Sequence, residues 1–242
     1  EEGERGASVS RDVADGDPWR GAEFVLAGML QSPHFLYRVQ VGEPDPEHPE
    51  RLRYTSWEMA ERLAILLWNR LPDEELLEAA GRGELLDDES LSAQVDRMLD
   101  DRRARDAVQD FFAQYLDLVR LGDVERDPAT YPGYTDSLEE AMRTEVKLVV
   151  DDVVFRQDAD IRALFSSRKS FVNTELAALY EVEAPGATPY TFVPVEFGDQ
   201  SPRAGILTLG AFLTMNAHPT ETSPPLRGKY LRERIFCKTV PA

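Results

Sequence analysis

Apolar residues recur at helical spacing through most of this chain, and this periodicity limits the folds that are open to it. A clear case is the stretch TSWEMAERLAILLWNRL, in which Met59, Leu63 and Leu67 share one face of a helix. Thr55 stands three residues before Glu58, the spacing of a capping box that marks a helix start. The sequence therefore predicts a mainly α fold, a multi-helix globular bundle.

Strand-like sequence is confined to one region, APGATPYTFVPVEFGDQSPRAG. Its aromatic and β-branched residues lie between turn-forming residues, which favours at most a small β-hairpin or an extended segment near 188–198. The expected organisation of the chain has five parts. The first two are a loop or disordered segment over 1–17 and the tail of a preceding helical module over 18–53. A central helical module over 54–182, a loop with a short β element over 183–202 and a C-terminal helical module over 203–242 follow.

Four stretches carry more detailed expectations. The apolar helix that starts at Pro18 should be buried, because its apolar stripe is broad. A long helical stretch follows at 87–121, with a joint at DDRRARD, and another helix runs from about Ser137 to Gln157. An apolar helix is expected from Arg203 onward.

Charge and cysteine content restrict the partners and cofactors. The 45 acidic and 27 basic residues give a net charge of -18, which repels nucleic acid, so no nucleic-acid partner is expected. No apolar run is long enough to predict a transmembrane segment. The single cysteine, Cys237, excludes an intrachain disulfide, a cysteine-based zinc site and a complete C-x-x-C-H haem attachment within these residues. No metal site and no cofactor within the chain are predicted.

Candidate catalytic residues are few. His218 lies five residues before Ser223, a possible base and nucleophile, but no nucleophile-elbow frame surrounds the serine. Ser223 followed by Pro224 also fits a helix N-cap with proline in the first turn. Glu145 and Asp152 share one helix face and could do acid/base or metal chemistry; the alternative is that they are solvated or paired with arginine.

Five stretches in the same order resemble modules of planctomycete and myxobacterial exported proteins. They match the domains of unknown function numbered fifteen-ninety-two and fifteen-eighty-eight, with the end of fifteen-ninety-five in front. The stretches are SPHFLYR at 32–38 and those at 62–85, 94–118, 170–182 and 203–237. The resemblance implies a multi-module protein with c-type cytochrome segments, in which a proline-rich linker and a C-x-x-C-H motif follow the last of these stretches. It provides no catalytic residues to carry over.

The resemblance also suggests a binding role for a basic cluster. Haem propionates or an acidic partner could face it, or the cations could pair with the chain's own acids at ordinary helical spacing. The cluster comprises Arg227, Lys229, Arg232, Arg234 and Lys238.

Three functions remain open at this stage. The first is an accessory or scaffold region of an exported, c-type-cytochrome-linked redox protein, which docks or shields a haem module supplied by other segments of the same precursor. The second is an extracellular oxidoreductase or hydrolase, with a site near His218, Thr222, Ser223 and Arg227 and with Glu145 as a possible partner. The third is a cell-surface binding or structural module, which a large exposed apolar patch would favour. The resemblance implies a periplasmic, cell-surface or secreted location.

Overall fold

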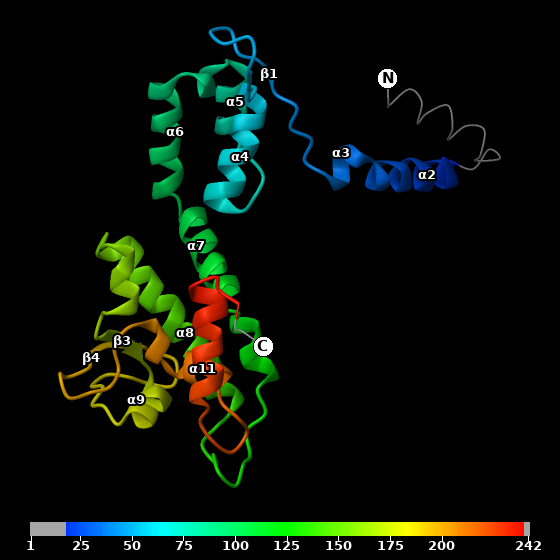
Figure 1. Cartoon of the computed structure of the whole chain (residues 1–242). Coiled ribbons are helices and arrows are strands. Elements are labelled where there is room, and N and C mark those ends of the chain that lie inside the picture. Colours follow the sequence, from blue (N-terminus) through cyan, green and yellow to red (C-terminus); the bar gives the residue numbers. More distant parts are fainter. Residues whose placement is uncertain (1–17, 240–242) are drawn as a thin grey trace. The chain divides into compact units, whose positions relative to one another are not determined.

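The computed structural model describes residues 18–239, so the loop or disorder expected over 1–17 lies outside the described residues (Figure 1). The chain divides into two compact units. Among the described residues, the N-terminal unit comprises 18–63 and Pro72–Ser92, and the C-terminal unit comprises Ala64–Leu71 and 93–239. The boundary between them falls within two helices, α4 and α6.

Helices dominate both units, which confirms the mainly α class. From the N-terminus, the elements are α2 (Pro18–Gln31), α3 (Pro33–Leu36), β1 (Glu43–Pro44), β2 (Leu52–Arg53), α4 (Ser56–Trp68), α5 (Glu74–Gly81), η1 (Glu84–Leu86) and α6 (Asp88–Asp100). They are followed by α7 (Arg102–Tyr115), η2 (Leu118–Asp123), α8 (Asp136–Asp151), η3 (Asp152–Arg156), η4 (Ile161–Phe165), β3 (Lys169–Val172), α9 (Thr174–Tyr180), β4 (Val193–Glu196), η5 (Ile206–Thr208), α10 (Gly210–Met215), α11 (Pro224–Tyr230) and η6 (Leu231–Ile235).

The predicted capping box at the start of α4 is confirmed. The Glu58 carboxylate accepts a hydrogen bond from the Thr55 N–H at 2.8 Å, and the Glu58 N–H donates to the Thr55 hydroxyl at 3.2 Å. The same carboxylate accepts from the N–H groups of Gly42 and Val41 at 3.0 and 2.8 Å. These hydrogen bonds lower the pKa of Glu58 to about 2, and the bond from Gly42 has the largest effect. One side chain therefore caps the helix and fixes the chain that precedes it.

The predicted joint in the 87–121 stretch lies at Asp101. Its carboxylate accepts from the N–H of Arg103 at 2.8 Å and so caps α7 directly after α6 ends. The Arg103 guanidinium lies 3.4 Å from the centre of the Trp68 ring, and the Trp68 indole N–H donates to the Met98 carbonyl at 2.8 Å. These contacts surround a tryptophan that is almost fully buried.

Helix α8 is the central element of the C-terminal unit. It contacts α7, β3, α9 and α10, and its inner face is formed by buried apolar side chains. The helix expected to run to Gln157 instead ends at Asp151 and continues as one π-helical segment, in which the Gln157 N–H donates to the Asp152 carbonyl at 2.9 Å. The buried side chains of α8 and η3 are Leu138, Ala141, Met142, Glu145, Val146, Val149, Val150, Asp151, Asp152 and Val153.

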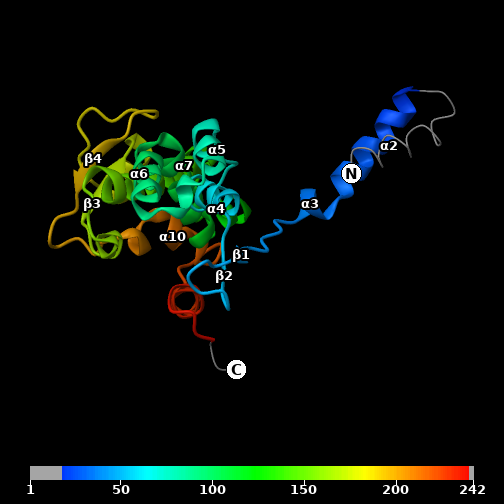
Figure 2. The same ribbon diagram turned by 90° about the horizontal axis from the view of Figure 1, so that it is seen from above.

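The extended segment expected near 188–198 is present as β4, but its partner was not predicted. β4 pairs antiparallel with β3, with Lys169 opposite Glu196 and Val172 opposite Val193 (Figure 1, Figure 2). Strand-like sequence is confined to the region near 188–198, so the sequence did not predict β3. Three consecutive β3 residues, Ser170–Val172, are buried, so the strand lacks the alternation that would reveal it.

The apolar helix expected from Arg203 is interrupted. Gly205 has a positive φ of 71° and starts the short helix η5, after which α10 begins only at Gly210. The Gly205 N–H donates to the Ser167 carbonyl at 2.7 Å. A Cβ placed on Gly205 would lie 2.2 Å from the Phe165 carbonyl carbon. Backbone packing against η4 therefore overrides the helical periodicity.

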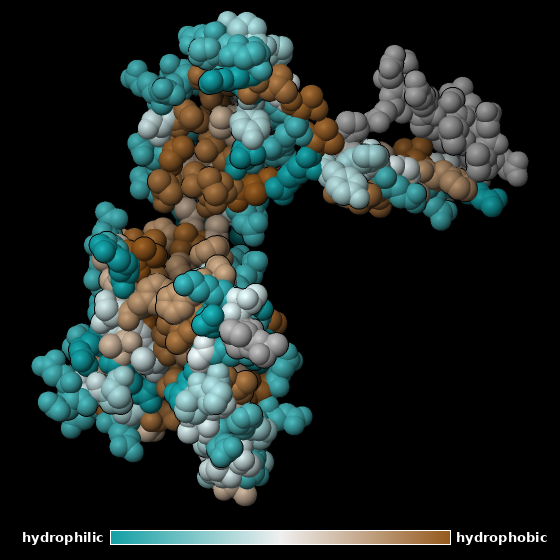
Figure 3. Space-filling model, viewed as in Figure 1, coloured by the Kyte–Doolittle hydropathy of each residue, from teal (hydrophilic) through white to brown (hydrophobic). Residues whose placement is uncertain are grey.

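The expectation that α2 is buried is wrong for this chain. Its large side chains are exposed, with Leu26 at 59% and Met29 at 62% of their full accessibility. Figure 3 shows apolar side chains along this helix on the molecular surface. Within the described residues, α2 packs closely only with α3. Periodicity indicates an apolar face, but it does not show that another element covers that face.

Candidate functional site

A buried carboxylate lies at the centre of the C-terminal unit. Glu145 on α8 has no exposed surface. Its Oε1 accepts from the Ser170 hydroxyl and its Oε2 from the Tyr180 hydroxyl, each at 2.6 Å. The Gly210 N–H donates to the Tyr180 oxygen at 2.7 Å. The side chain is thus neither solvated nor paired with arginine, and the expectation of either environment is wrong.

Burial determines the protonation of this group. It raises the pKa of Glu145 to about 7, against the opposing effect of the hydrogen bonds from Ser170 and Tyr180 and of the Arg203 charge. Burial and the adjacent Glu145 carboxylate also raise the pKa of Tyr180 well above its usual value. Glu145 therefore exchanges a proton near neutral pH, whereas Tyr180 keeps its own.

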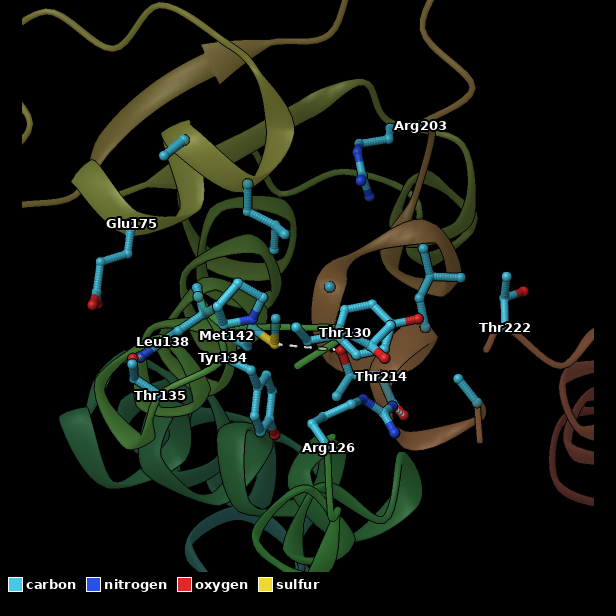
Figure 4. A pocket seen from close by; sticks show the side chains of 18 residues that line it. Arg126, Thr130, Tyr134, Thr135, Leu138, Met142, Glu175, Arg203, Thr214 and Thr222 are labelled. Atoms are coloured by element: carbon cyan, nitrogen blue, oxygen red, sulfur yellow. Dashed lines mark hydrogen bonds between the residues drawn. The ribbon is translucent and has the colours of Figure 1, made fainter. Parts of the chain in front are cut away.

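A pocket of about 690 Å³ lies next to this network (Figure 4). Gly210 and Arg203 line it, and both also contact Tyr180: Gly210 through its N–H, and Arg203 through a guanidinium that lies 4.1 Å from the ring centre. The sequence did not indicate this arrangement, because Ser170 and Tyr180 lie 25 and 35 residues from Glu145. The one signal in the sequence that pointed to this arrangement was a single glutamate, Glu145, among apolar helix positions.

Part of the pocket wall comes from two loops that Arg126 holds together, and the rest comes from α8, α9, α10 and Arg203. The Arg126 guanidinium donates to the backbone carbonyls of His218, at 3.0 Å, and of Thr214. The neighbouring residue, Asp127, adds a backbone bond between the same two loops: its N–H donates to the Pro219 carbonyl at 3.2 Å. The loop that precedes α8 is therefore tied to the loop between α10 and α11.

The structure does not bring the three candidate catalytic residues together. His218 is exposed, and its N–H donates to the Glu221 carbonyl at 2.9 Å. Ser223 is buried and accepts from the Leu226 N–H at 3.4 Å, which confirms its predicted role as the N-cap of α11. The Thr222 hydroxyl accepts from Arg227 at 2.9 Å. Within residues 18–239, no hydrogen bond joins Glu145, His218 and Ser223 to one another.

Asp151 and Asp152 form ion pairs at the end of α8. The Asp151 oxygens lie 3.1 Å from Arg105 Nε and 3.2 Å from Arg156 Nε. Both Asp152 oxygens accept from Lys169 Nζ at 2.8 Å. Asp151 thus pairs with two arginines, whereas Asp152, for which arginine pairing was the alternative, pairs with a lysine instead. No group of three or more potential metal ligands occurs in the described part of the chain.

The basic cluster lies on the segment 224–239, which packs on the C-terminal unit through Tyr230. The Tyr230 ring meets Phe212 edge to face at 5.2 Å, and its hydroxyl donates to the Tyr115 carbonyl at 3.4 Å. The Arg234 Nη2 atom lies 3.5 Å from the Asp117 Oδ2 atom and forms an ion pair with it. Among the described residues, the other four cations form no ion pair with an acid, so the expected internal pairing is found for Arg234 alone. These four cations, Arg227, Lys229, Arg232 and Lys238, are called the basic surface below.

Two family models match this chain. The model described as a protein of unknown function, DUF1592 (PSD4), matches residues 54–182, more than half of the chain. The chain belongs to this family. A second model of unknown function, DUF1588 (PSCyt3), matches residues 203–242. Both names are those of planctomycete cytochrome-associated modules. No curated protein and no solved structure gives a significant match.

The two matches divide the features of this DUF1592 protein between them. The DUF1592 segment supplies Glu145, Ser170 and Tyr180, whereas the DUF1588 segment supplies Gly210, Arg203 and the basic surface. In the described residues, no helix is both long and apolar enough to cross a membrane.

Proposed function

We propose that this chain is an accessory helical region of an exported, c-type-cytochrome-linked redox protein. It would dock a haem domain belonging to other segments of the same precursor, at a periplasmic, cell-surface or secreted location. The observation that carries this proposal is the basic surface: among the described residues, four cations have no acidic partner, in a chain of net charge -18. The DUF1588 match covers the segment that presents them.

The geometry suits docking because the segment is anchored on one side and charged on the other. Tyr230 is buried, whereas Lys229, Arg232 and Lys238 are exposed. Arginine and lysine bind carboxylates, so haem propionates and acidic side chains around a haem edge are matching groups. Complementary charge steers association and fixes orientation more than it adds affinity. Haem would be held by the docked domain, since one cysteine cannot form the usual attachment motif.

Zero-length crosslinking of the full-length precursor tests this docking. A carbodiimide joins lysine amines to carboxylates in direct contact, so Lys229 and Lys238 should crosslink to the haem domain, detected by mass spectrometry. Lys147, exposed on α8, serves as the matched control and should not. In 1 M salt the docking crosslinks should fall several-fold, because the Debye length shortens to about 3 Å.

Two results would contradict the docking proposal. One is a precursor without covalently attached haem in its absorption spectrum. The other is a crosslink pattern in which Lys147 reaches the haem domain as often as Lys229 does.

A double charge reversal, Lys229→Glu with Arg232→Glu, should reduce crosslinking through Lys238. The control pair Arg102→Glu with Arg162→Glu, elsewhere on the surface, should leave that crosslinking unchanged.

A further inference from the structure

The pocket beside the Glu145 network has the size and lining of a small-molecule site. Its volume of about 690 Å³ lies within the range of ligand pockets, roughly 300–1,000 Å³. Apolar side chains make up much of the wall, with Leu138, Met142, Leu179 and Leu213 among them. Tyr131 and Tyr134 add aromatic surface. Such a wall favours an apolar ligand body.

Arg203 supplies the polar group that would orient a ligand. One of its terminal nitrogens donates to the Thr208 carbonyl at 2.8 Å, and stacking on Tyr180 fixes the plane of the guanidinium. In the described structure, no acidic side chain lies within ion-pair distance of Arg203. A guanidinium has five N–H donors, and its fork matches a carboxylate in two parallel hydrogen bonds. The remaining donors are therefore available to an anionic group.

The other charged residues of the pocket are already engaged. Arg126 donates to the carbonyls of Thr214 and His218. Glu175 accepts from the Ser137 hydroxyl at 2.6 Å. Figure 4 shows Arg203 and Arg126 on opposite sides of the pocket, with Met142 and Thr130 between them, and Glu175 on a third side. Arg203 thus offers a cationic group with open donors beside an apolar wall.

We propose that this pocket binds an organic carboxylic acid with an apolar body, whose carboxylate pairs with Arg203. The body would lie against Met142, Leu138 and Leu213. This binding is separate from haem docking: it uses Arg203 and residues of α8, α9 and α10, and it holds whether or not the basic surface has a partner. No bond is made or broken in the proposed complex.

Binding of 2-naphthoate to the 242-residue chain, measured by calorimetry, tests the site. The neutral 2-naphthamide has the same body and lacks the charge. We expect naphthoate to bind saturably and more tightly than the amide. Arg203→Gln should weaken naphthoate binding about tenfold, the loss expected for one charge-assisted interaction, and should change amide binding little. Arg162→Gln, at an exposed arginine outside the pocket, is the matched control.

A second variant separates loss of the site from loss of the fold. Leu179 is 43% exposed and lines the pocket, so Leu179→Trp can fill the space without disrupting the core. This variant should retain the far-ultraviolet circular dichroism of the wild-type chain and bind neither probe. The proposal is overturned if naphthoate shows no saturable binding at millimolar concentration. It also fails if Arg203→Gln weakens both probes equally, or if Leu179→Trp binds both as the wild-type chain does.

Discussion

Relative to a Glu145→Gln variant, the wild-type chain should lose about 3 kcal/mol of stability as the pH rises from 4.5 to 7. Burial raises the pKa of Glu145 from 4.5 to about 7. Between these values the folded chain binds a proton that the unfolded chain has released, so the free energy of unfolding falls with rising pH. Above about pH 8 both states have released the proton, and the difference becomes constant.

Glutamine is the appropriate replacement because it keeps the shape and the hydrogen-bonding capacity of the side chain. Its carbonyl can accept from the Tyr180 hydroxyl, while its amide group donates to the Ser170 oxygen. The variant has no proton to exchange, so it lacks this pH dependence. The pKa values of Glu58 and Asp101 are lowered from 4.5 and 3.8 to about 2, so their contribution to stability is lost as the pH falls from about 4.5 toward 2. These two carboxylates are present in both chains, so the difference between wild type and Glu145→Gln is unaffected by them.

Urea unfolding at pH 5, 6, 7 and 8 measures the effect. The curves of unfolding free energy against pH for wild type and for Glu145→Gln should converge or cross over this range. Glu140→Gln, an exposed position on the same helix, reports the effect of removing one surface charge. Parallel curves for wild type and Glu145→Gln would show that the Glu145 proton is not taken up on folding.

The second large effect should come from Gly205→Ala, which we expect to destabilise the chain by about 3–5 kcal/mol. The residue has a positive φ of 71°, and an added Cβ would lie 2.2 Å from the Phe165 carbonyl carbon and 2.3 Å from its oxygen. These are backbone atoms, so no side chain can rotate away. Relief requires that η4 and η5 move apart, which also breaks the hydrogen bond from the Gly205 N–H to Ser167.

Gly186→Ala is the matched control for this prediction. Gly186 has a φ of 86°, yet a Cβ there would meet nothing within 4 Å. Its replacement should cost only the conformational strain, about 1–2 kcal/mol. Thermal unfolding of both variants separates the two contributions. Equal losses of stability would mean that the contact with Phe165 relaxes at little cost.

Local signals explain which parts of the fold could be predicted. The capping box at Thr55, the joint at Asp101 and the cap at Ser223 each depend on residues within three positions, and all three were predicted correctly. The strand β3 was missed because its partner lies more than 20 residues away and its residues do not alternate in burial. The exposure of α2 was missed because a periodic pattern does not show what covers it.

The site was less predictable than the fold for the same reason. Glu145 was identified as a candidate, but its hydrogen bonds with Ser170 and Tyr180 depend on how β3 and α9 pack on α8. Arg203 was read only as the start of a helix, because its position over Tyr180 arises from the irregular chain before η5. In contrast, His218 and Ser223 lie close in sequence, yet no hydrogen bond in the described chain joins them.

The Arg126 contacts have a consequence for how the pocket can change in evolution. Arg126 binds the backbone oxygens at Thr214 and His218, which every amino acid possesses. Substitutions at these two positions can therefore alter the surface offered to a ligand while the loop keeps its place. Related chains that retain an arginine at position 126 could then differ in what they bind and still share one pocket architecture.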